Sequence, residues 1–225
     1  MDQIRFQTFD GVTIVGDWVA APTTLGAALL LHMMPADRKS WLAFQQMLAE
    51  RGIASLAIDL RGHGESTEGP GDSRINYKNF GEEEHQSSLN DATEAFDWIK
   101  RRGFEPSRIA VVGASIGANL AVQLLIEEPA MAGAALLSPG ADYHGIKALE
   151  DATSVLNHQA VWVTASEEDD QSSFDCANEL ITRLSSDEKV LVPMKNAGHG
   201  TAILEQQPDV AKQLADWVAR IVQEG

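Results

Sequence analysis

Short apolar runs alternate with amphipathic segments along most of this chain. The continuous apolar runs occupy residues 27–31, 53–58, 109–112, 132–137, 160–165 and 189–194. Such runs, without alternating polar positions, are typical of strands that are buried on both faces of a sheet. Between them, apolar residues recur at helical spacing over residues 40–51, 88–102, 118–126, 173–184 and 202–222. This alternation predicts a mostly parallel sheet with helices on both faces.

The N-terminal segment has a different pattern. Residues 3–9 and 12–20 are rich in strand-forming residues, and Asp10-Gly11 lies between them. An Asp-Gly pair flanked by such runs is a strong hairpin signal, so we expect an antiparallel pair of strands at one edge of the sheet. With the six later runs this predicts an eight-stranded α/β sheet. The chain contains no internal repeat or low-complexity linker, which predicts a single domain over residues 1–225.

Two segments between the predicted elements are less regular. Residues 65–86 contain Gly69, Pro70, Gly71 and an acidic run, and a stretch of this length is either a functional loop or contains an undetected element. Residues 139–158 carry only a short helical patch. We expect no large cap domain in either place. Ser40 is the predicted N-cap of the helix over residues 40–51.

Charge and cysteine content narrow the class of protein. The net charge of −16 predicts repulsion from nucleic acid and from anionic membrane surfaces, so neither is expected as a partner. Cys176 is the only cysteine, which excludes an intramolecular disulfide and suits a reducing compartment. The N-terminal residues MDQIRFQTF contain no apolar signal core behind a basic start. We therefore expect a soluble, cytoplasmic protein.

The candidate chemistry begins at Gly113-Ala114-Ser115-Ile116-Gly117, which matches G-x-S-x-G between a predicted strand and a predicted helix. In this context the pattern predicts a nucleophile elbow, a sharp turn that exposes the serine hydroxyl above the edge of the sheet. Glycines two residues on either side remove the Cβ atoms that would obstruct the turn. The alternative is an ordinary glycine-rich turn without a catalytic role.

Other polar groups follow the ends of the other predicted strands. They are Met33-Met34, residues 59–66, Asp169 or Asp170, and His199. Since the carboxyl ends of parallel strands lie at one edge of a sheet, we expect these groups to gather around Ser115. Their convergence is the main sequence argument for an active site.

A serine nucleophile requires a base with a pKa near neutrality and a carboxylate that orients this base. Among the six histidines, His199 follows the serine, comes after a late strand and lies in a glycine-flanked loop. Glu167-Glu168-Asp169-Asp170 supplies candidate carboxylates in the order Ser, Asp, His. The chain has no spaced His and Cys set for zinc, and an acidic run alone is poor evidence for calcium.

These motifs resemble those of the α/β-hydrolase superfamily, in its small, capless carboxylesterase and dienelactone-hydrolase-like branch. The matching motifs are DLRGHGES at 59–66, GASIG at 113–117, EEDD after a strand, and AGHG at 197–200. The resemblance implies that Ser115 is the nucleophile and His199 the base. It favours Asp169 over Asp170 as the acid, because Ser166 takes the place of the small residue that ends the strand. It also implies oxyanion-hole amides at Ile116 and Met34.

The chain departs from the family pattern in two places. Met33 replaces the usual glycine of the oxyanion loop, which affects the path of that loop. Dienelactone hydrolases use a cysteine nucleophile, whereas this elbow carries serine, so we expect ordinary ester hydrolysis. The sequence thus predicts a serine carboxylesterase for neutral short-chain acyl esters, with a small-molecule partner and no cofactor. Thioesterase, lactonase and acyltransferase activities remain alternatives, as does a non-catalytic ligand-binding protein.

Overall fold

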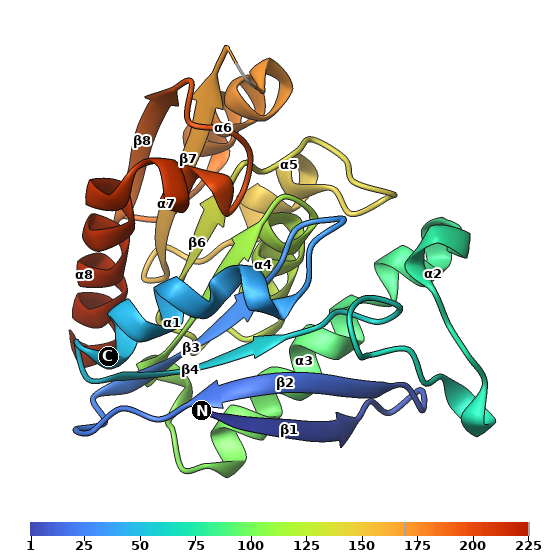
Figure 1. The fold of residues 1–225 in the computed structure, drawn as a ribbon. Coiled ribbons are helices and arrows are strands. Elements are labelled where there is room, and N and C mark those ends of the chain that lie inside the picture. The colour runs from blue at the N-terminus through green and yellow to red at the C-terminus, as the bar shows by residue number, and fades with distance from the viewer. Residues whose placement is uncertain (169, 225) are drawn as a thin grey trace.

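The computed structural model of the chain describes residues 1–168 and 170–224, and in this part the strands form one eight-stranded sheet (Figure 1). Their order across the sheet is β1-β2-β4-β3-β5-β6-β7-β8. The strands are β1 (Asp2–Gln7), β2 (Thr13–Val19), β3 (Gly26–Leu31), β4 (Ile53–Ile58), β5 (Ile109–Ala114), β6 (Gly133–Leu137), β7 (Ala160–Glu167) and β8 (Lys189–Lys195).

The strand directions confirm the predicted mixed sheet. Strand β2 runs antiparallel to both β1 and β4, with Ile4 opposite Gly16 and Gly16 opposite Ile58. The pairs from β4 through β3, β5, β6 and β7 to β8 are all parallel. The carboxyl ends of the parallel strands therefore lie at one edge of the sheet, where the candidate residues were expected.

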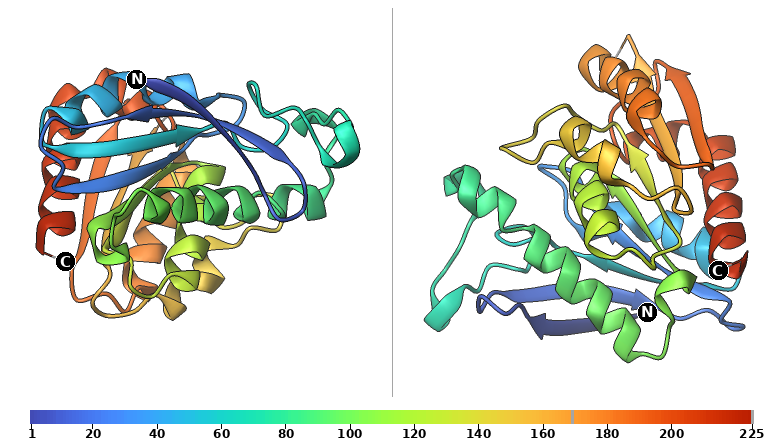
Figure 2. Two further views of the ribbon diagram at one scale, coloured as in Figure 1. Left: turned by 90° about the horizontal axis from the view of Figure 1, so that it is seen from below. Right: turned by 180° about the vertical axis from the view of Figure 1, so that it is seen from behind.

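Helices cover both faces of the sheet (Figures 1 and 2). Helices α1 (Leu42–Ala49) and α8 (Pro208–Glu224) pack on one face. Helices α3 (Leu89–Arg101), α4 (Ile116–Glu127) and α6 (Gln171–Arg183) pack on the other. The shorter elements are α2 (Glu82–Gln86), α5 (Ala148–Asp151) and α7 (Ala202–Gln206), with single 3-10 turns η1 (Arg38–Trp41), η2 (Pro70–Asp72), η3 (Tyr77–Asn79), η4 (Pro106–Arg108) and η5 (Ala152–Ser154).

Burial of the central strands explains why their sequences are continuously apolar. Every residue of β3, β4, β5 and β6 is buried. Side chains of one strand alternate between the two faces, so Leu29 and Leu31 join the core beneath α3 and α4, whereas Ala28 and Leu30 join the core beneath α1 and α8. A sheet with two buried faces fixes the register of each strand, because a slip by one residue would exchange the two sets of side chains.

The structure differs from the sequence prediction in three local respects. The C-terminal helix is divided into α7 and α8, because Pro208 has no amide hydrogen and begins a new helix. Asp37 rather than Ser40 caps the segment before α1, and its side chain accepts a hydrogen bond from the Lys39 amide at 2.8 Å. The irregular segment 65–86 contains η2, η3 and α2 and extends beyond the sheet at the right of Figure 1.

The described residues form no large cap domain over the carboxyl edge of the sheet (Figure 1). Segment 65–86 and the loop between β6 and α5 extend past this edge (Figure 2). In residues 1–168 and 170–224, no helix has the length and apolar character needed to cross a membrane.

Candidate active site

Ser115 occupies a sharp turn between β5 and α4. Its backbone angles, φ 54° and ψ −119°, lie in a region that non-glycine residues rarely adopt. A Cβ atom at Gly113 would lie 2.0 Å from the Gly117 carbonyl oxygen, and one at Gly117 would lie 2.3 Å from the Leu31 carbonyl oxygen. The G-x-S-x-G spacing is thus a steric requirement of this turn, which has the geometry of a nucleophile elbow.

The turn leaves donor amides free beside the serine. Ile116 is the first residue of α4, where amides have no partner within the helix. Within the described residues, neither the Ile116 amide nor the Met34 amide donates a hydrogen bond to another protein group. The close approach of Gly117 to the carbonyl groups of Leu31 and His32 brings the two segments that carry these amides together. Both candidate oxyanion donors named from the sequence are therefore available.

His199 lies in the loop between β8 and α7, and its Nδ1 forms a hydrogen bond with the carboxylate of Asp170. Asp170 is the N-cap of α6, and its other carboxylate oxygen accepts hydrogen bonds from the Ser173 amide at 3.3 Å and the Ser172 hydroxyl at 3.2 Å. Asp169, the aspartate favoured by the family resemblance, lies outside the described residues. Among those described, Asp170 is the acidic partner of His199.

The surroundings of Asp170 hold this carboxyl group in its charged form. Partial burial by itself raises its pKa, but hydrogen bonds from Ser173 and His199 outweigh this effect and lower the pKa below its usual range. The N-terminus of α6 acts in the same direction, because the partial positive charge there favours an anion. An ionised Asp170 can accept a hydrogen bond from Nδ1–H of His199, which leaves Nε2 as the basic atom of the ring.

Two serine hydroxyls hold the loop that carries His199. The Ala197 amide donates to the Ser166 hydroxyl at 2.9 Å, and the Gly200 amide donates to the Ser138 hydroxyl at 3.0 Å. Ser138 directly follows Leu137, whose carbonyl oxygen accepts from the Ser115 amide at 2.8 Å. The His199 loop is thus attached to the ends of β6 and β7, beside the elbow.

The packing around Gly200 also shows that the His199 loop lies close to the elbow. A Cβ atom at Gly200 would lie 2.5 Å from the Met33 sulfur and 3.4 Å from the Ala114 Cβ. The residue after His199 therefore touches both the residue before Ser115 and the oxyanion loop. The sequence analysis did not identify Ser138, and a lone serine at a strand end gives no motif that could have identified it.

Arg38 and Asp59 connect the oxyanion loop to the loop after β4. Asp59 accepts hydrogen bonds from the Arg38 amide at 2.8 Å and the Glu65 amide at 2.7 Å, and it pairs with the Arg38 guanidinium. The same guanidinium pairs with Asp17 at 3.0 Å and with Glu65 at 2.7 Å. Arg38 was not identified from the sequence, although a buried carboxylate at Asp59 requires a cation of this kind.

His32 makes a second connection between these loops. The Leu60 amide donates to His32 Nε2 at 3.0 Å, so the ring proton is on Nδ1, which donates to the Met33 carbonyl oxygen at 2.9 Å. Complete burial lowers the pKa of His32 to about 4, which keeps the ring neutral. The bond to Met33 fixes the peptide that precedes Met34, the candidate oxyanion donor.

The DLRGHGES motif has a structural role in this arrangement. A Cβ atom at Gly64 would lie 2.1 Å from a carboxylate oxygen of Asp59. Ser66 donates to the Asp59 carbonyl oxygen at 2.8 Å and accepts from the Val15 amide at 2.8 Å. Arg61 pairs with buried Asp91 at 2.7 Å. The motif therefore supports the candidate site without supplying a reacting group.

The two flanking segments meet at a pair of histidines. The rings of His85, in α2, and His144, in the loop after β6, are stacked with centroids 4.1 Å apart. Asn119 of α4 holds this loop through hydrogen bonds to the carbonyl oxygens of Gly140 at 2.9 Å and Ile146 at 2.7 Å. Any substrate at Ser115 approaches a site bordered by short polar segments.

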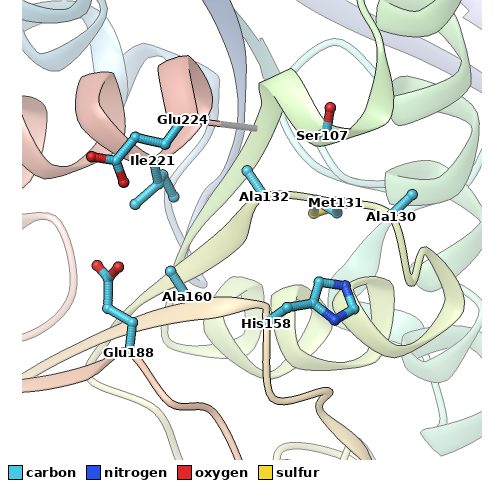
Figure 3. A pocket seen from close by; sticks show the side chains of 9 residues that line it. All are labelled: Ser107, Ala130, Met131, Ala132, His158, Ala160, Glu188, Ile221 and Glu224. Atoms are coloured by element: carbon cyan, nitrogen blue, oxygen red, sulfur yellow. The ribbon is translucent and has the colours of Figure 1, made fainter.

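The cavity shown in Figure 3 is not this site. Its volume is about 180 Å³, and its lining includes Ser107, Ala132, His158 and Glu188, which precede β5, β6, β7 and β8. It therefore lies at the amino ends of the strands, opposite the elbow. Across residues 1–168 and 170–224, no three His, Cys, Asp or Glu side chains are grouped so that they could hold a metal ion.

The sequence of the chain matches a known protein family. Residues 26–222 match the model of a family described as serine aminopeptidase, S33. No curated protein sequence was found to match the chain.

Solved structures share the fold at low sequence identity. An esterase of Pyrococcus furiosus, Pf2001, is 19% identical with a TM-score of 0.79, over 98% of this chain and 92% of that chain. The α/β hydrolase GrgF from Penicillium is 15% identical with a TM-score of 0.75, over 98% of both chains. The esterase domain of a Rhodothermus marinus protein is 13% identical with a TM-score of 0.71, also over 98% of both chains. At these identities the likeness establishes the fold.

Proposed function

Because the chain belongs to the family described as serine aminopeptidase S33, within the α/β-hydrolase superfamily, we propose that it is a serine hydrolase that cleaves carboxylic esters. The observation that carries this proposal is the position of Ser115 in a strained elbow beside the loop that holds the His199–Asp170 pair. A strained serine next to a hydrogen-bonded histidine–carboxylate pair has a direct use in acyl transfer.

In the proposed reaction, His199 removes the proton of the Ser115 hydroxyl while Ser115 attacks the ester carbonyl carbon. The amides of Ile116 and Met34 stabilise the tetrahedral oxyanion, an interaction for which each donor typically contributes about 3 kcal/mol. His199 then protonates the departing alcohol. Water, activated by the same histidine, hydrolyses the acyl-enzyme and returns the proton to Ser115.

The acid role is assigned to Asp170 in this proposal, in place of Asp169. The supporting observations are its hydrogen bond to His199 Nδ1 and its N-cap position on α6. An N-cap carboxylate is held on two sides, which suits a group that must fix the orientation of an imidazole.

We also propose a preference for neutral, short acyl esters, roughly acetyl to hexanoyl. Most residues of segment 65–86 are exposed and the loop 139–147 is short, whereas an acyl groove for long chains would require an extensive apolar lining, since each buried methylene contributes about 0.8 kcal/mol. The net charge of −16 also disfavours anionic substrates, an effect that salt reduces.

The family description favours a second candidate function, cleavage of an N-terminal amino acid from a peptide. The same serine and histidine could act on an amide, and the acidic protein would attract a free amine. The described residues form no cap domain that would select a peptide terminus, so ester hydrolysis remains the first proposal.

A substrate screen distinguishes these functions. Acetate, butyrate, octanoate and palmitate esters of one alcohol should be compared with the matching thioesters, a lactone series, succinate half-esters and amino acid arylamides, at two salt concentrations. We expect kcat/KM to be highest for neutral acetate or butyrate esters. Added salt should raise kcat/KM for the anionic half-esters and leave that of the neutral esters unchanged. A maximum at palmitate would contradict the chain-length proposal, and faster cleavage of arylamides would favour the aminopeptidase.

A further inference from the structure

A groove of about 650 Å³ lies at the edge of the sheet opposite the candidate active site. Its lining comes from the end of β2, the start of β4 and the connection between α3 and β5, and it includes Trp18, Leu25, Phe104, Glu105, Arg102 and Arg108. Leu25 precedes β3 and Arg108 precedes β5, so the groove lies at the amino ends of the parallel strands. Ligand sites of small molecules have volumes in this range.

The two arginines of this groove differ from the other arginines of the chain. Seven of the ten arginines form ion pairs with carboxylates, and Arg74 donates to the Thr67 hydroxyl. Among the arginines of the described residues, only the exposed side chains of Arg102 and Arg108 form neither an ion pair nor a hydrogen bond, and both line this groove. In a chain with 33 acidic residues, two unpaired guanidinium groups at one place require an explanation.

Aromatic rings form a firm layer on one side of the groove. The Trp18 ring contacts Trp98 edge-on with centroids 5.3 Å apart and Phe104 with centroids 6.0 Å apart. The Arg102 guanidinium lies over the Trp98 ring at 4.4 Å, which holds the cation beside this layer without neutralising it. The groove therefore presents an apolar surface next to a fixed positive charge.

Glu105 also lines the groove, and its carboxylate limits the negative charge that a bound ligand can carry. With two guanidinium groups and one carboxylate, the groove carries one net positive charge. One negative charge on a ligand balances it, whereas a second would face Glu105 without a partner. A carboxylate suits the planar fork of an arginine and leaves the remainder of the ligand to the aromatic layer.

We propose that this groove binds a small organic monocarboxylate with an apolar body, its carboxylate between Arg102 and Arg108 and its body against Trp18 and Phe104. The site is separate from the candidate active site and does not depend on the proposed ester hydrolysis. Arg102 follows α3 and Arg108 precedes β5, whereas Ser115, Asp170 and His199 follow the carboxyl ends of strands, so we expect hydrolysis not to require the two arginines.

The test uses 2-naphthoate as the probe, with calorimetry and quenching of tryptophan fluorescence as readouts. We expect saturable binding at one site, an affinity loss of at least fivefold in Arg102→Gln and in Arg108→Gln, and no detectable binding in the double variant. Arg74→Gln is the matched control, because Arg74 also lacks a carboxylate partner but lies outside the groove. Its affinity for 2-naphthoate should equal that of the unaltered protein.

Neutral 2-naphthalenemethanol and dianionic 2-naphthyl phosphate test the role of charge, and both should bind at least fivefold more weakly than 2-naphthoate. Circular dichroism and unchanged esterase activity of the two glutamine variants would show that these variants remain folded. Undiminished binding of 2-naphthoate by the double variant, tighter binding of the alcohol or the phosphate, or no binding at millimolar concentrations would each overturn the proposal.

Discussion

The two carboxylate oxygens of Asp170 accept hydrogen bonds from different parts of the site. One oxygen accepts a hydrogen bond from Nδ1 of His199, and the other accepts a hydrogen bond from the Ser173 amide at the start of α6. The helix thus orients the carboxylate, and the carboxylate orients the histidine. Ser115 is constrained in a comparable way, because its unusual backbone angles are imposed by the glycine contacts on both sides. At the scale of single residues, the proposed acyl transfer depends on the geometry that the backbone imposes on these side chains.

Asp170→Asn removes the charge but retains the size of the side chain. The asparagine favours the wrong tautomer of His199, so we expect kcat to fall by up to about 10⁴-fold with little change in KM. Asp175→Asn, on the exposed side of the same helix, is the matched control and should leave kcat unchanged. If Asp169→Asn lost this activity while Asp170→Asn retained it, the acid assignment would be wrong.

Sequence patterns identified Ser115 and His199 as candidates but could not choose one aspartate within EEDD. Adjacent residues in a loop point in different directions, and a shift of one position leaves every local pattern intact. The proposal for Asp170 rests instead on its hydrogen bond to His199 and on its position as the N-cap of α6. Arg38 and Ser138 were missed for a related reason, since their partners lie 21 and 62 residues away in the sequence.

At the scale of elements, the loop between β8 and α7 is the part that must be held most accurately. It carries His199 on a short segment, and two serine hydroxyls from the ends of β6 and β7 bind its amides. A hydroxyl acceptor at each end limits the motion of the imidazole relative to the elbow. Strands and long helices were predicted well, because the period of burial is visible in the sequence. The division between α7 and α8 was not predicted, although Pro208 marks its position.

Ser138→Ala and Ser166→Ala test this anchoring. Each variant leaves a buried amide of the His199 loop without its acceptor. Such a loss typically lowers the free energy of unfolding by about 1–3 kcal/mol. We expect kcat to fall about tenfold with KM nearly constant, because the base is misplaced while the binding surface is retained.

Thr164→Val is the control for these variants. It removes a hydrogen bond to the Val192 carbonyl oxygen between β7 and β8 and leaves the loop untouched. Its thermal stability should fall comparably, but kcat should not. Equal kcat in all three variants would mean that the hydroxyls contribute to stability alone.

At the scale of the whole molecule, buried ionisable groups connect the loops at the carboxyl edge of the sheet. His32 and His63 are both buried, their rings are 4.9 Å apart, and His63 stacks on Tyr77. Burial lowers the pKa of each histidine to about 4. The eight-stranded architecture followed from the sequence, but this network did not, because it joins segments that only the fold brings together.

The network makes stability depend on pH. A histidine with a folded-state pKa near 4 and an unfolded-state pKa near 6.5 binds its proton preferentially in the unfolded chain between these values. Its contribution to stability is therefore complete above pH 6.5 and is lost as the pH falls towards 4. From pH 7 to pH 5, each such histidine should lower the free energy of unfolding by about 2 kcal/mol.

Urea unfolding of the protein and of His63→Phe at several pH values measures this contribution. Phenylalanine can retain the stack on Tyr77 but cannot be protonated, so the variant should lose less stability than the unaltered protein between pH 7 and pH 5. The difference in the free energy of unfolding between the two proteins at each pH excludes the titration of other groups, because both proteins contain those groups. His158→Gln, at an exposed position, should behave like the unaltered protein. Parallel curves for the protein and His63→Phe would contradict the assigned pKa.

Ser115 is the nucleophile of the proposed reaction, and covalent labelling tests this role most directly. After reaction with a fluorophosphonate probe, intact-protein mass spectrometry should show one adduct, and peptide fragmentation should place it on Ser115. Ser115→Ala should show no adduct and no ester hydrolysis, with an unchanged circular dichroism spectrum. An adduct on another serine, or hydrolysis retained by Ser115→Ala, would contradict the proposed mechanism.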